Sequence, residues 1–545
     1  MELPLIDIII VIAYLVGLLL FGLWFSRFVK TDRDYFLAGR SLPFWAIGMS
    51  IVVSDIGAVD FVSLCGASYK YGIVAANMDW IGTMPAIILA AFIFIPHYWR
   101  AGVYSVPEYL GRRFNPAVRG IQTAVWTLFL VVNLALVFWA TATMFDTLLG
   151  PDLWQWTGIV PEPSASSPDP AFTRKMLYVV ITAVFTGAYT ISGGLAAVVY
   201  TDVVQMVIMF AGALVIVGLG LYHPDLGVGG FSGLRETLVE LDKTDHLTLF
   251  FPADTTTPFP WHGVLLGLAL VQAPAYFIGN QAIVQRTLGA RDEWAAKAGT
   301  LFGGFLKFFI PLLVVLPGLL AVVLVPGLED VDTAFPELVR RLLPIGLRGI
   351  VFAGFLAAMM SSVDSIATSA ATLVTHDVYT GLFRARPSDR SLLIIGRTVT
   401  LALFVFGVIT ASAMEGDTLI YGVIQHSLAV VQGPTWGLIL LGMLWRRATP
   451  AGGLWGLIAG LAVSIGLTFW QKAPWFETRP FESEEPFMFI AAISFAVTVV
   501  ALAAVSLATR PLPPERIRGL VYKATLDDAD AQDALNERAG DEESP

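Results

Sequence analysis

The chain contains many apolar segments that are each long enough to cross the hydrocarbon core of a lipid bilayer. About 20 apolar residues in a helix span that core. The chain has 545 residues, of which 56% are hydrophobic and only 14% are charged. These features exclude an ordinary water-soluble protein and predict an all-α polytopic membrane protein. Thirteen spans are predicted, at residues 5–28, 42–69, 75–97, 121–149, 176–191, 196–222, 262–284, 298–325, 349–374, 392–413, 419–445, 452–470 and 488–508.

Basic residues are distributed unevenly between alternate loops. With the N-terminus placed outside, the cytoplasmic loops and the C-terminal tail hold 22 Lys and Arg residues, and the outside loops hold ten. Because cytoplasmic loops are enriched in basic residues, we expect a cell-membrane protein with its N-terminus outside and its C-terminus in the cytoplasm. The single cysteine, Cys65, excludes a disulfide framework and a Cys-based metal site. No basic, aromatic region predicts nucleic-acid binding.

The second predicted span differs from the others because it carries acidic residues and glycines. Asp55 and Asp60 lie near its middle, and Gly48, Gly57 and Gly66 interrupt it. A carboxylate at that depth normally faces an internal polar cavity. Glycines there favour a discontinuous helix, whose freed carbonyls can face a cation. We therefore expect this span to form half of a transport site.

The seventh span is interrupted as well, by Pro274 and Gly279. A lone proline is explained equally well by a simple kink, but the two interrupted spans occupy the first and sixth positions of a ten-span core. That correspondence indicates two five-span inverted repeats with two discontinuous helices. The predicted organisation is an N-terminal extra helix in 1–30, repeats in 41–223 and 262–446, two peripheral helices in 452–509 and an acidic cytoplasmic tail in 510–545.

The ninth span carries a stripe of small residues. Ala358, Ser361, Ser362 and Ser365 are spaced three and four apart, so they share one helical face. Such stripes are usually packing faces in membrane helices, but hydroxyl and carbonyl oxygens are also hard donors suited to a small cation. Asp364 adds a charge that packing does not need. We interpret this face as the other half of a cation site.

Two further charged residues fall in predicted spans. Asp79 opens the third span, and Lys307 is the single basic residue assigned to the interior of a span. An ion pair that only fixes helix packing is one interpretation of Lys307. Charges within a membrane more often mark a substrate or ion pathway, which favours a functional role.

Several motifs resemble those of a known family. The chain contains SDIG, GIVAANMDW, RAGVYSVPEYLGRRF, YTISGGLAAVVYTDVVQ, NQAIVQRTLGAR, LKFFIPLLVVLPG and AAMMSSVDSIATSAATL. Over residues 5–470 they resemble the sodium:solute symporter family, and within it the sodium/sugar branch. The resemblance implies alternating access in a lipid bilayer, with Na⁺ as the coupling ion and no organic cofactor. We expect the chain to function as a monomer, although the sequence leaves its oligomeric state open. The sequence shows no Ser/His/Asp order, no metal-binding His cluster and no phosphate loop, so we do not expect an enzyme.

The resemblance also implies roles for individual residues. For the principal sodium site it implies the carbonyls of Val53, Ile56 and Ala358 with the hydroxyls of Ser361 and Ser362. The substrate contacts that it implies are Asp55, Asp60, Asp79, Lys307 and Gln425, with Tyr276 as an aromatic gate. The resemblance places Asp202 in the element that helps to form a further sodium site in two-sodium members, beside Ser362, Asp364 and Ser365. Our own hypothesis is that Asp202 and Asp364 form this second cation site, for Na⁺ or a proton.

The predicted substrate cavity is more acidic than a hexose requires. Asp55 stands where the sugar branch commonly has Asn, Asp60 where His or Gln is common, and Asp79 where Glu is usual. The proline branch also has Asp at position 55, so proline, another amino acid or a monocarboxylate is an alternative solute. Lys307, Gln425 and Asp79 favour a sugar or polyol, since they donate to and accept from hydroxyls. A transporter-like solute sensor is a further alternative, disfavoured by the short tail.

Overall fold

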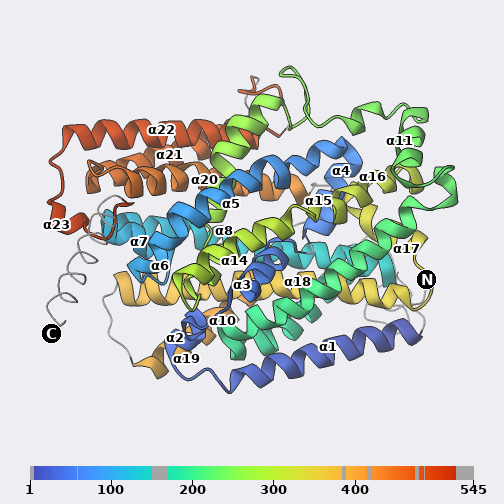
Figure 1. Cartoon of the computed structure of the whole chain (residues 1–545), viewed down its shortest axis with the longest axis horizontal. Helices are drawn as coiled ribbons and strands as arrows, with labels where there is room; N and C mark the ends of the chain where they lie inside the picture. Colours follow the sequence, from blue (N-terminus) through green and yellow to red (C-terminus); the bar gives the residue numbers. More distant parts are fainter. Residues whose placement is uncertain are drawn as a thin grey trace, which may run out of the picture.

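The structure, a computed structural model, describes residues 5–57, 59–149, 170–382, 388–413, 420–472, 478–483 and 485–522. Throughout these ranges the regular secondary structure is helical, and the only strand-like pairings there are the isolated bridges Leu42–Ala290 and Phe251–Pro260. The helices run roughly parallel and antiparallel to one another in one bundle (Figure 1). Because each spanning segment is a helix, its backbone hydrogen bonds are formed within the segment, as a lipid environment requires.

The described helices account for all thirteen predicted spans. Nine helices are long and apolar enough to cross a membrane, and three bent helix pairs raise the total to twelve. The N-terminal helix α1 (Leu5–Ser26) supplies a further apolar segment. The unbroken spans lie at Ile73–Ala101, Pro116–Thr147, Ala171–Ala188, Gly194–Leu221, Leu347–Gly381, Asp389–Ala411, Ile420–Leu444, Pro450–Lys472 and Phe487–Ala508.

The second predicted span is broken where its sequence suggested. Helix α3 (Phe44–Asp55) ends at a residue with non-helical backbone angles, Ile56. The chain resumes as the π-helix η2 (Asp60–Leu64) and α4 (Cys65–Tyr71), bent by 59° from α3. The break leaves the last carbonyls of α3 without helical partners, as the predicted cation site requires.

The seventh span is also broken, and a neighbouring one bends where no interruption was predicted. The helix formed by η8 (Gly263–Gln272) and α12 (Ala273–Gly279) meets α13 (Gln281–Leu288) at 50°. The eighth span bends by 41° between α14 (Glu293–Lys307) and the segment Ile310–Leu324. Pro311 lies in the first turn after that bend, and its missing N–H and its ring disfavour a continuous helix across the bend. The structure therefore contains a third bent span in addition to the two predicted.

The fifth and sixth spans are joined without a loop. They form one helix, α10 (Pro170–Leu221), which is interrupted at Gly194 with φ +61°. A Cβ atom there would lie 2.9 Å from the carbonyl oxygen of Tyr35, so both the backbone angle and the close contact require glycine. The predicted boundary between residues 191 and 196 is thereby confirmed.

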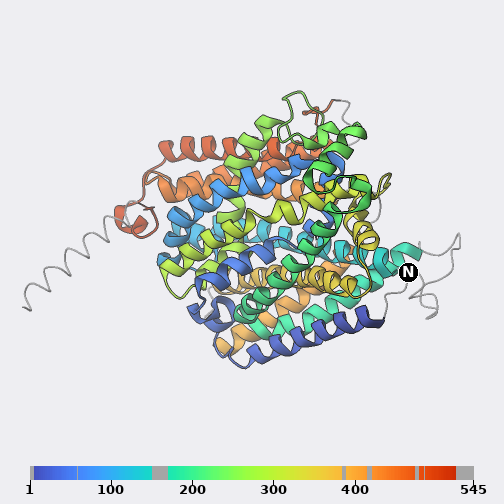
Figure 2. The ribbon, with the colours of Figure 1, turned by 45° about the vertical axis from the view of Figure 1, so that its right-hand side comes forward.

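Helix α18 (Leu347–Thr372) forms the centre of the bundle. The most apolar 18-residue stretch of its span is 94% buried, and α18 packs against α1, α3, α10, α8 (Pro116–Leu149) and α19 (Asp389–Ala411). Helices α21 (Pro450–Lys472) and α22 (Phe487–Ala508) lie side by side at one edge, and α1 lies at the opposite edge (Figures 1 and 2). The predicted all-helical fold with discontinuous helices is confirmed, and the residue limits of the two repeats remain predictions.

The remaining elements connect or cover these spans. They are α2 (Asp32–Leu37), η1 (Ala38–Arg40), η3 (Ile73–Ala76), η4 (Met78–Thr83), α5 (Met84–Leu89), η5 (Ala90–Phe94), α6 (Ile95–Ala101), α7 (Val106–Arg113), η6 (Pro224–Leu226), α11 (Gly230–Glu240), η7 (Thr244–Leu247), α15 (Ile310–Leu313), α16 (Val315–Leu324), η9 (Val331–Thr333), α17 (Ala334–Leu342), η10 (Leu373–Leu382), α20 (Ile420–Leu444) and α23 (Pro514–Ile517).

Candidate functional site

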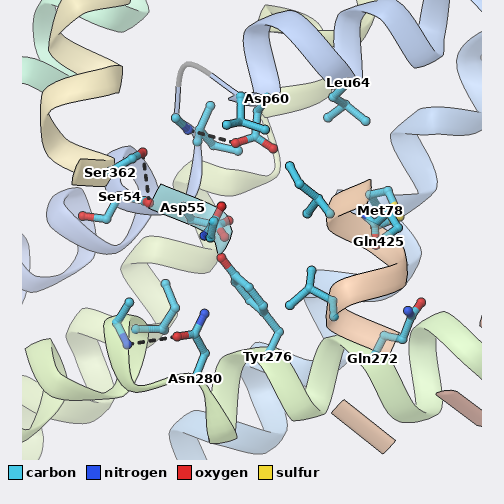
Figure 3. Close-up of a pocket in the computed structure, with 18 of the residues that line it drawn as sticks. Ser54, Asp55, Asp60, Leu64, Met78, Gln272, Tyr276, Asn280, Ser362 and Gln425 are labelled. Carbon is cyan, nitrogen blue, oxygen red and sulfur yellow. Dashed lines mark hydrogen bonds between the residues drawn. The ribbon is translucent and has the colours of Figure 1, made fainter. Parts of the chain in front are cut away.

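A cavity lies beside the break between α3 and η2. Its volume is about 150 Å³, and an apolar cavity of about that size in another protein holds a benzene ring. Its wall combines apolar side chains with polar ones from several helices (Figure 3). All six predicted substrate-contact residues line it, namely Asp55, Asp60, Asp79, Tyr276, Lys307 and Gln425. The structure thus brings together residues that are up to 370 positions apart in the sequence.

Lys307 joins two of the three cavity carboxylates. Its ammonium group forms ion pairs with Asp55 and with Asp79, the latter at 2.8 Å. The side chains of all three residues are at most 7% exposed. The Lys307 nitrogen also lies 5.6 Å from the centre of the Phe277 ring. The ion pair considered in the sequence analysis therefore exists, and it forms part of the cavity wall rather than a distant packing contact.

Asp60 is held differently, by the backbone of the helix break. Its Oδ2 accepts a hydrogen bond of 2.9 Å from the Gly57 amide, at the start of the second half-helix. A free amide at a helix N-terminus favours a negative charge. Tyr276 points its hydroxyl toward Asp55 from α12 (Figure 3). Tyr276 thus lines the cavity beside Asp55, and its role as a gate stays a prediction.

The predicted principal sodium site lies where α18 meets the helix break. The Ser54 and Ser361 hydroxyls are 3.2 Å apart, and the Ser362 hydroxyl donates to the Ser54 carbonyl at 3.5 Å. A Cβ atom on Gly57 would overlap the Ser362 hydroxyl and lie 3.9 Å from the Ala358 carbonyl oxygen. Val53 and Ile56, the other two predicted donors, lie in the last turn of α3 and just after it. The oxygen atoms of α18 therefore lie against Ser54 and Gly57 of the helix break, next to the two carbonyls predicted from α3.

Arg286 is a buried basic residue beside the predicted site that the sequence analysis missed. Its side chain is 1% exposed, and its guanidinium donates to the hydroxyls of Ser50, Ser54 and Ser365 and contacts Asp202 at 3.4 Å. The prediction that Lys307 is the single basic residue within a span is therefore wrong. It failed because the seventh span was ended at residue 284, which assigned Arg286 to a cytoplasmic loop. The helix α13 is buried along its whole length, through Leu288.

The three residues of the predicted second cation site lie around this guanidinium. Asp202 accepts hydrogen bonds from Ser50 and Ser54 in addition to its contact with Arg286. Ser365 donates at 2.5 Å to the Ser361 carbonyl, one turn earlier in α18. Asp364 accepts from Thr190 of α10. A positive charge supplied by the protein therefore already faces Asp202.

Other polar groups of the cavity have no partner in the described part of the chain. They include both amide atoms of Gln272, which is 2% exposed, and Oδ2 of Asp79. Buried polar groups are normally hydrogen-bonded, so the atoms of Gln272 and Asp79 are candidates for contact with a ligand.

His426 follows the cavity residue Gln425 in the sequence, but its side chain pairs with Glu485 at 2.7 Å and with the Gly422 carbonyl at 3.0 Å.

Comparisons with known proteins agree with the motif resemblance. The model of the sodium:solute symporter family matches residues 35–158 and 175–460. The sodium/glucose cotransporter of Vibrio parahaemolyticus is 30% identical over 486 residues, which cover 85% of each chain. The sodium/myo-inositol cotransporter 2 of Oryctolagus cuniculus is 31% identical over 564 residues, which cover 95% of this chain and 78% of that protein.

Solved structures give the same result for the fold. A Na⁺-coupled sialic acid symporter in a substrate-bound outward-open state is similar with a TM-score of 0.74 at 22% identity, over 93% of this chain and 99% of that one. The nucleobase-cation-symport-1 transporter Mhp1 is similar with a TM-score of 0.55 at 12% identity, over 90% and 99% of the two chains. Because the family model matches most of the length of this chain, the chain belongs to the sodium:solute symporter family.

Proposed function

We propose that this protein couples the inward flow of Na⁺ to the uptake of a small polar solute, a sugar or polyol, by alternating access. The observation that carries the proposal is the contact between the broken α3–η2 helix and the hydroxyl face of α18, directly beside a polar cavity. The glucose and myo-inositol cotransporters among its relatives support this class of solute. The proposed orientation has the N-terminus outside and the C-terminus in the cytoplasm.

For the principal Na⁺ site we propose the five donors predicted from the sequence. These are the carbonyls of Val53, Ile56 and Ala358 and the hydroxyls of Ser361 and Ser362. Neutral oxygen donors suit a hard monovalent cation, and Gly57 allows the two sets to approach. A bound Na⁺ would hold α3 and α18 together and so fix the cavity wall formed by the break.

The second cation site around Asp202, Asp364 and Ser365 stays a prediction with a narrower basis. Because Arg286 contacts Asp202, charge balance at that carboxylate does not need another cation. The hypothesis therefore depends mainly on Asp364. An Asp364→Asn variant with an unchanged Na⁺ Hill coefficient and an unchanged pH profile of uptake would remove it.

The cavity residues are suited to hold a hydroxylated ring. Carboxylate oxygens accept hydrogen bonds from hydroxyls, whereas Lys307 and the amides of Gln425 and Gln272 can donate to them. Tyr276 supplies an aromatic face against the ring. Because Lys307 already pairs with Asp55 and Asp79, these three side chains are positioned for the solute before it binds.

The coupling needs no covalent chemistry. Na⁺ entering from outside stabilises the break, the solute then fills the cavity, and movement of the core exposes both to the cytoplasm. One charge crossing 100 mV contributes about 2.3 kcal/mol, which corresponds to roughly fifty-fold accumulation. Two coupled cations would square that limit.

Uptake into proteoliposomes tests this function. The panel is glucose, galactose, myo-inositol, proline and a monocarboxylate, each with and without an inward Na⁺ gradient. We expect Na⁺-driven accumulation of a sugar or inositol, reduced at least about ten-fold by Ser362→Ala because a proposed Na⁺ ligand is removed. Ser412→Ala, on an exposed residue at the end of α19, is the matched control.

The other outcomes separate the alternatives. Accumulation of proline or of the monocarboxylate instead would keep the Na⁺ coupling and overturn the assignment of the solute. If no solute accumulates in response to the Na⁺ gradient, the transport function itself is contradicted, and a solute sensor becomes the better explanation.

A further inference from the structure

The charged groups in the cavity wall do not balance. Asp55, Asp60 and Asp79 supply three carboxylates, and Lys307 is the one basic side chain among the residues that line the cavity. Lys307 is shared between Asp55 and Asp79, whereas Asp60 is held by the neutral Gly57 amide. One Na⁺ at the helix break would therefore still leave the site with an excess negative charge. Such an excess is costly in a buried site unless a positive group is bound there.

The cavity also has unused hydrogen-bonding capacity. Gln272 is 2% exposed and lines the cavity, yet neither its oxygen nor its nitrogen has a partner in the described part of the chain. Oδ2 of Asp79 lacks one as well. Leaving such a group unpaired in a buried site is destabilising. These atoms independently indicate a polar ligand that donates and accepts hydrogen bonds next to the carboxylates.

The surroundings favour an organic cation over a divalent metal ion. Across the described residues, no group of three or more His, Cys, Asp or Glu side chains is placed to hold a metal. Aromatic rings line the same space, among them Tyr276 and Tyr421, and such rings attract organic cations. A solute carboxylate would face three carboxylates, and its natural partner, Lys307, is already engaged twice.

We propose that the preferred solute carries a protonated amine on a hydroxylated ring, as an amino sugar or amino polyol does, and that Asp60 is the counter-ion of that amine. This inference rests on the proposed function and specifies the solute of the same cavity. The Gly57 amide orients one oxygen of Asp60, which leaves the other for the ammonium group. Gln272, Gln425 and Lys307 are then available to hydrogen-bond with the ring hydroxyls.

The test compares ligands that differ in one group. Binding of glucosamine, glucose and N-acetylglucosamine to the purified full-length protein is measured by calorimetry in Na⁺ buffer at about pH 6.5, where an amine is protonated. We expect glucosamine to bind at least ten-fold more tightly than glucose. N-acetylglucosamine, which has the nitrogen but no charge, should lose that advantage.

Variants at Asp60 show whether this carboxylate is responsible. In Asp60→Asn the ratio of the glucosamine and glucose affinities should fall to about one, and Asp60→Glu should restore a preference for the amine. Asp254→Asn, on an exposed loop residue, is the control and should retain the full ratio. Because the wild-type protein alone gives the preference, the proposal remains testable even if a variant fails to fold.

Several outcomes would overturn the proposal. One is that glucosamine binds no better than glucose, and another is that Asp60→Asn weakens both ligands equally. A third is glucose binding that strengthens as the pH falls and loses this dependence in Asp60→Asn, which would identify a proton as the missing charge. Na⁺-driven uptake of glucose without a preference for glucosamine contradicts this inference alone. Absence of any Na⁺-driven uptake contradicts the proposed function.

Discussion

At the scale of single residues, the closeness of α3 to α18 depends on the absence of a side chain at position 57. Gly57 faces the Ser362 hydroxyl so closely that a methyl group would overlap it. Here glycine is required by contact with another helix, because Gly57 is not among the glycines with a positive φ. The residue therefore links a local break in the sequence to the geometry of the proposed sodium site.

Gly57→Ala should weaken Na⁺ binding. Overpacking costs about 1–3 kcal/mol, which corresponds to an increase of roughly five-fold to more than 100-fold in the Na⁺ concentration that gives half-maximal uptake. Gly466→Ala is the matched control because no atom lies within 4 Å of its added methyl group. Equal Na⁺ dependence of the two variants would contradict the role assigned to Gly57.

The buried Arg286 cluster gives a second prediction at this scale. Removing one partner of a buried ion pair typically costs about 3–5 kcal/mol, because the other charge is left uncompensated. Arg286→Gln should therefore lower the thermal stability of the purified protein strongly, and the double variant Arg286→Gln/Asp202→Asn should recover part of the loss. An Arg286→Gln protein that melts at the wild-type temperature would show that the pair does not support the fold.

At the scale of helices, α1 is attached to the centre of the bundle by its one buried carboxylate. Asp7 accepts hydrogen bonds from the amides of Gly346 and Gly349 at 2.9 and 2.7 Å. These amides lie at the start of α18, where helical N–H groups lack partners. The peripheral first helix thus caps the helix that carries the proposed sodium donors.

Asp7→Ala should reduce stability by about 1–3 kcal/mol, the cost of leaving buried amides unsatisfied. A lower melting temperature in detergent is expected, whereas the Na⁺ dependence of the protein that remains folded should change little. Asp245→Asn, on an exposed turn, is the control. Wild-type stability of Asp7→Ala would mean that α1 is held by its apolar contacts alone.

Asp332 lies outside the membrane spans and connects its own 3-10 turn, η9, to two of them. It lies in η9, accepts a hydrogen bond of 3.0 Å from the Ile420 amide at the start of α20, and packs near Gly66 of α4. The pKa of its carboxyl is raised to about 7, mainly by burial and also by the nearby charge of Asp330. The hydrogen bond from the Ile420 amide and the charge of Lys175 oppose this shift. The folded protein therefore keeps this proton at a pH at which the unfolded chain has lost it.

This raised pKa sets the sign of a pH dependence. Because the folded state binds more protons between about pH 4 and pH 7, stability should fall as the pH rises through that range and level off above it. Each pKa unit is worth about 1.4 kcal/mol. Melting temperatures measured across this range should decline in the wild type and decline less in Asp332→Asn. Parallel profiles for the two proteins would contradict the assignment.

The sequence predicted the elements well because their signals are local. Apolar length places the spans, and the glycines and carboxylates around Gly57 indicate the first break. The bend at Pro311 was missed because its flanks are as apolar as an unbroken span. Arg286 was missed because the seventh span was ended at residue 284, and its partners, such as Asp202 and Ser365, lie too far away in the sequence to correct that boundary. For Lys307 the sequence offered two interpretations, an ion pair with an Asp or a place in the substrate cavity, and the structure combines them, since Lys307 pairs with Asp55 and Asp79 in the cavity wall.

At the scale of the whole molecule, the arrangement separates a buried centre from a lipid-facing exterior. Helix α18 carries polar groups inward, whereas large apolar side chains are exposed on outer helices, for example Leu20 on α1 and Val500 on α22. The polar sites are therefore enclosed by protein, where charges are tolerated. Moving a cation through such a centre requires that the centre be exposed first to one side of the membrane and then to the other. Transport therefore involves movement of the entire bundle.

The central claim is that Na⁺ drives solute accumulation, and the accumulation ratio at equilibrium tests it most directly. Proteoliposomes would be given an inward Na⁺ gradient of about ten-fold and a neutral transported sugar, with the membrane potential either at zero or near 100 mV, inside negative. One coupled Na⁺ predicts about ten-fold accumulation without the potential and roughly fifty-fold more with it. An accumulation ratio that changes with neither the Na⁺ gradient nor the membrane potential would contradict the account.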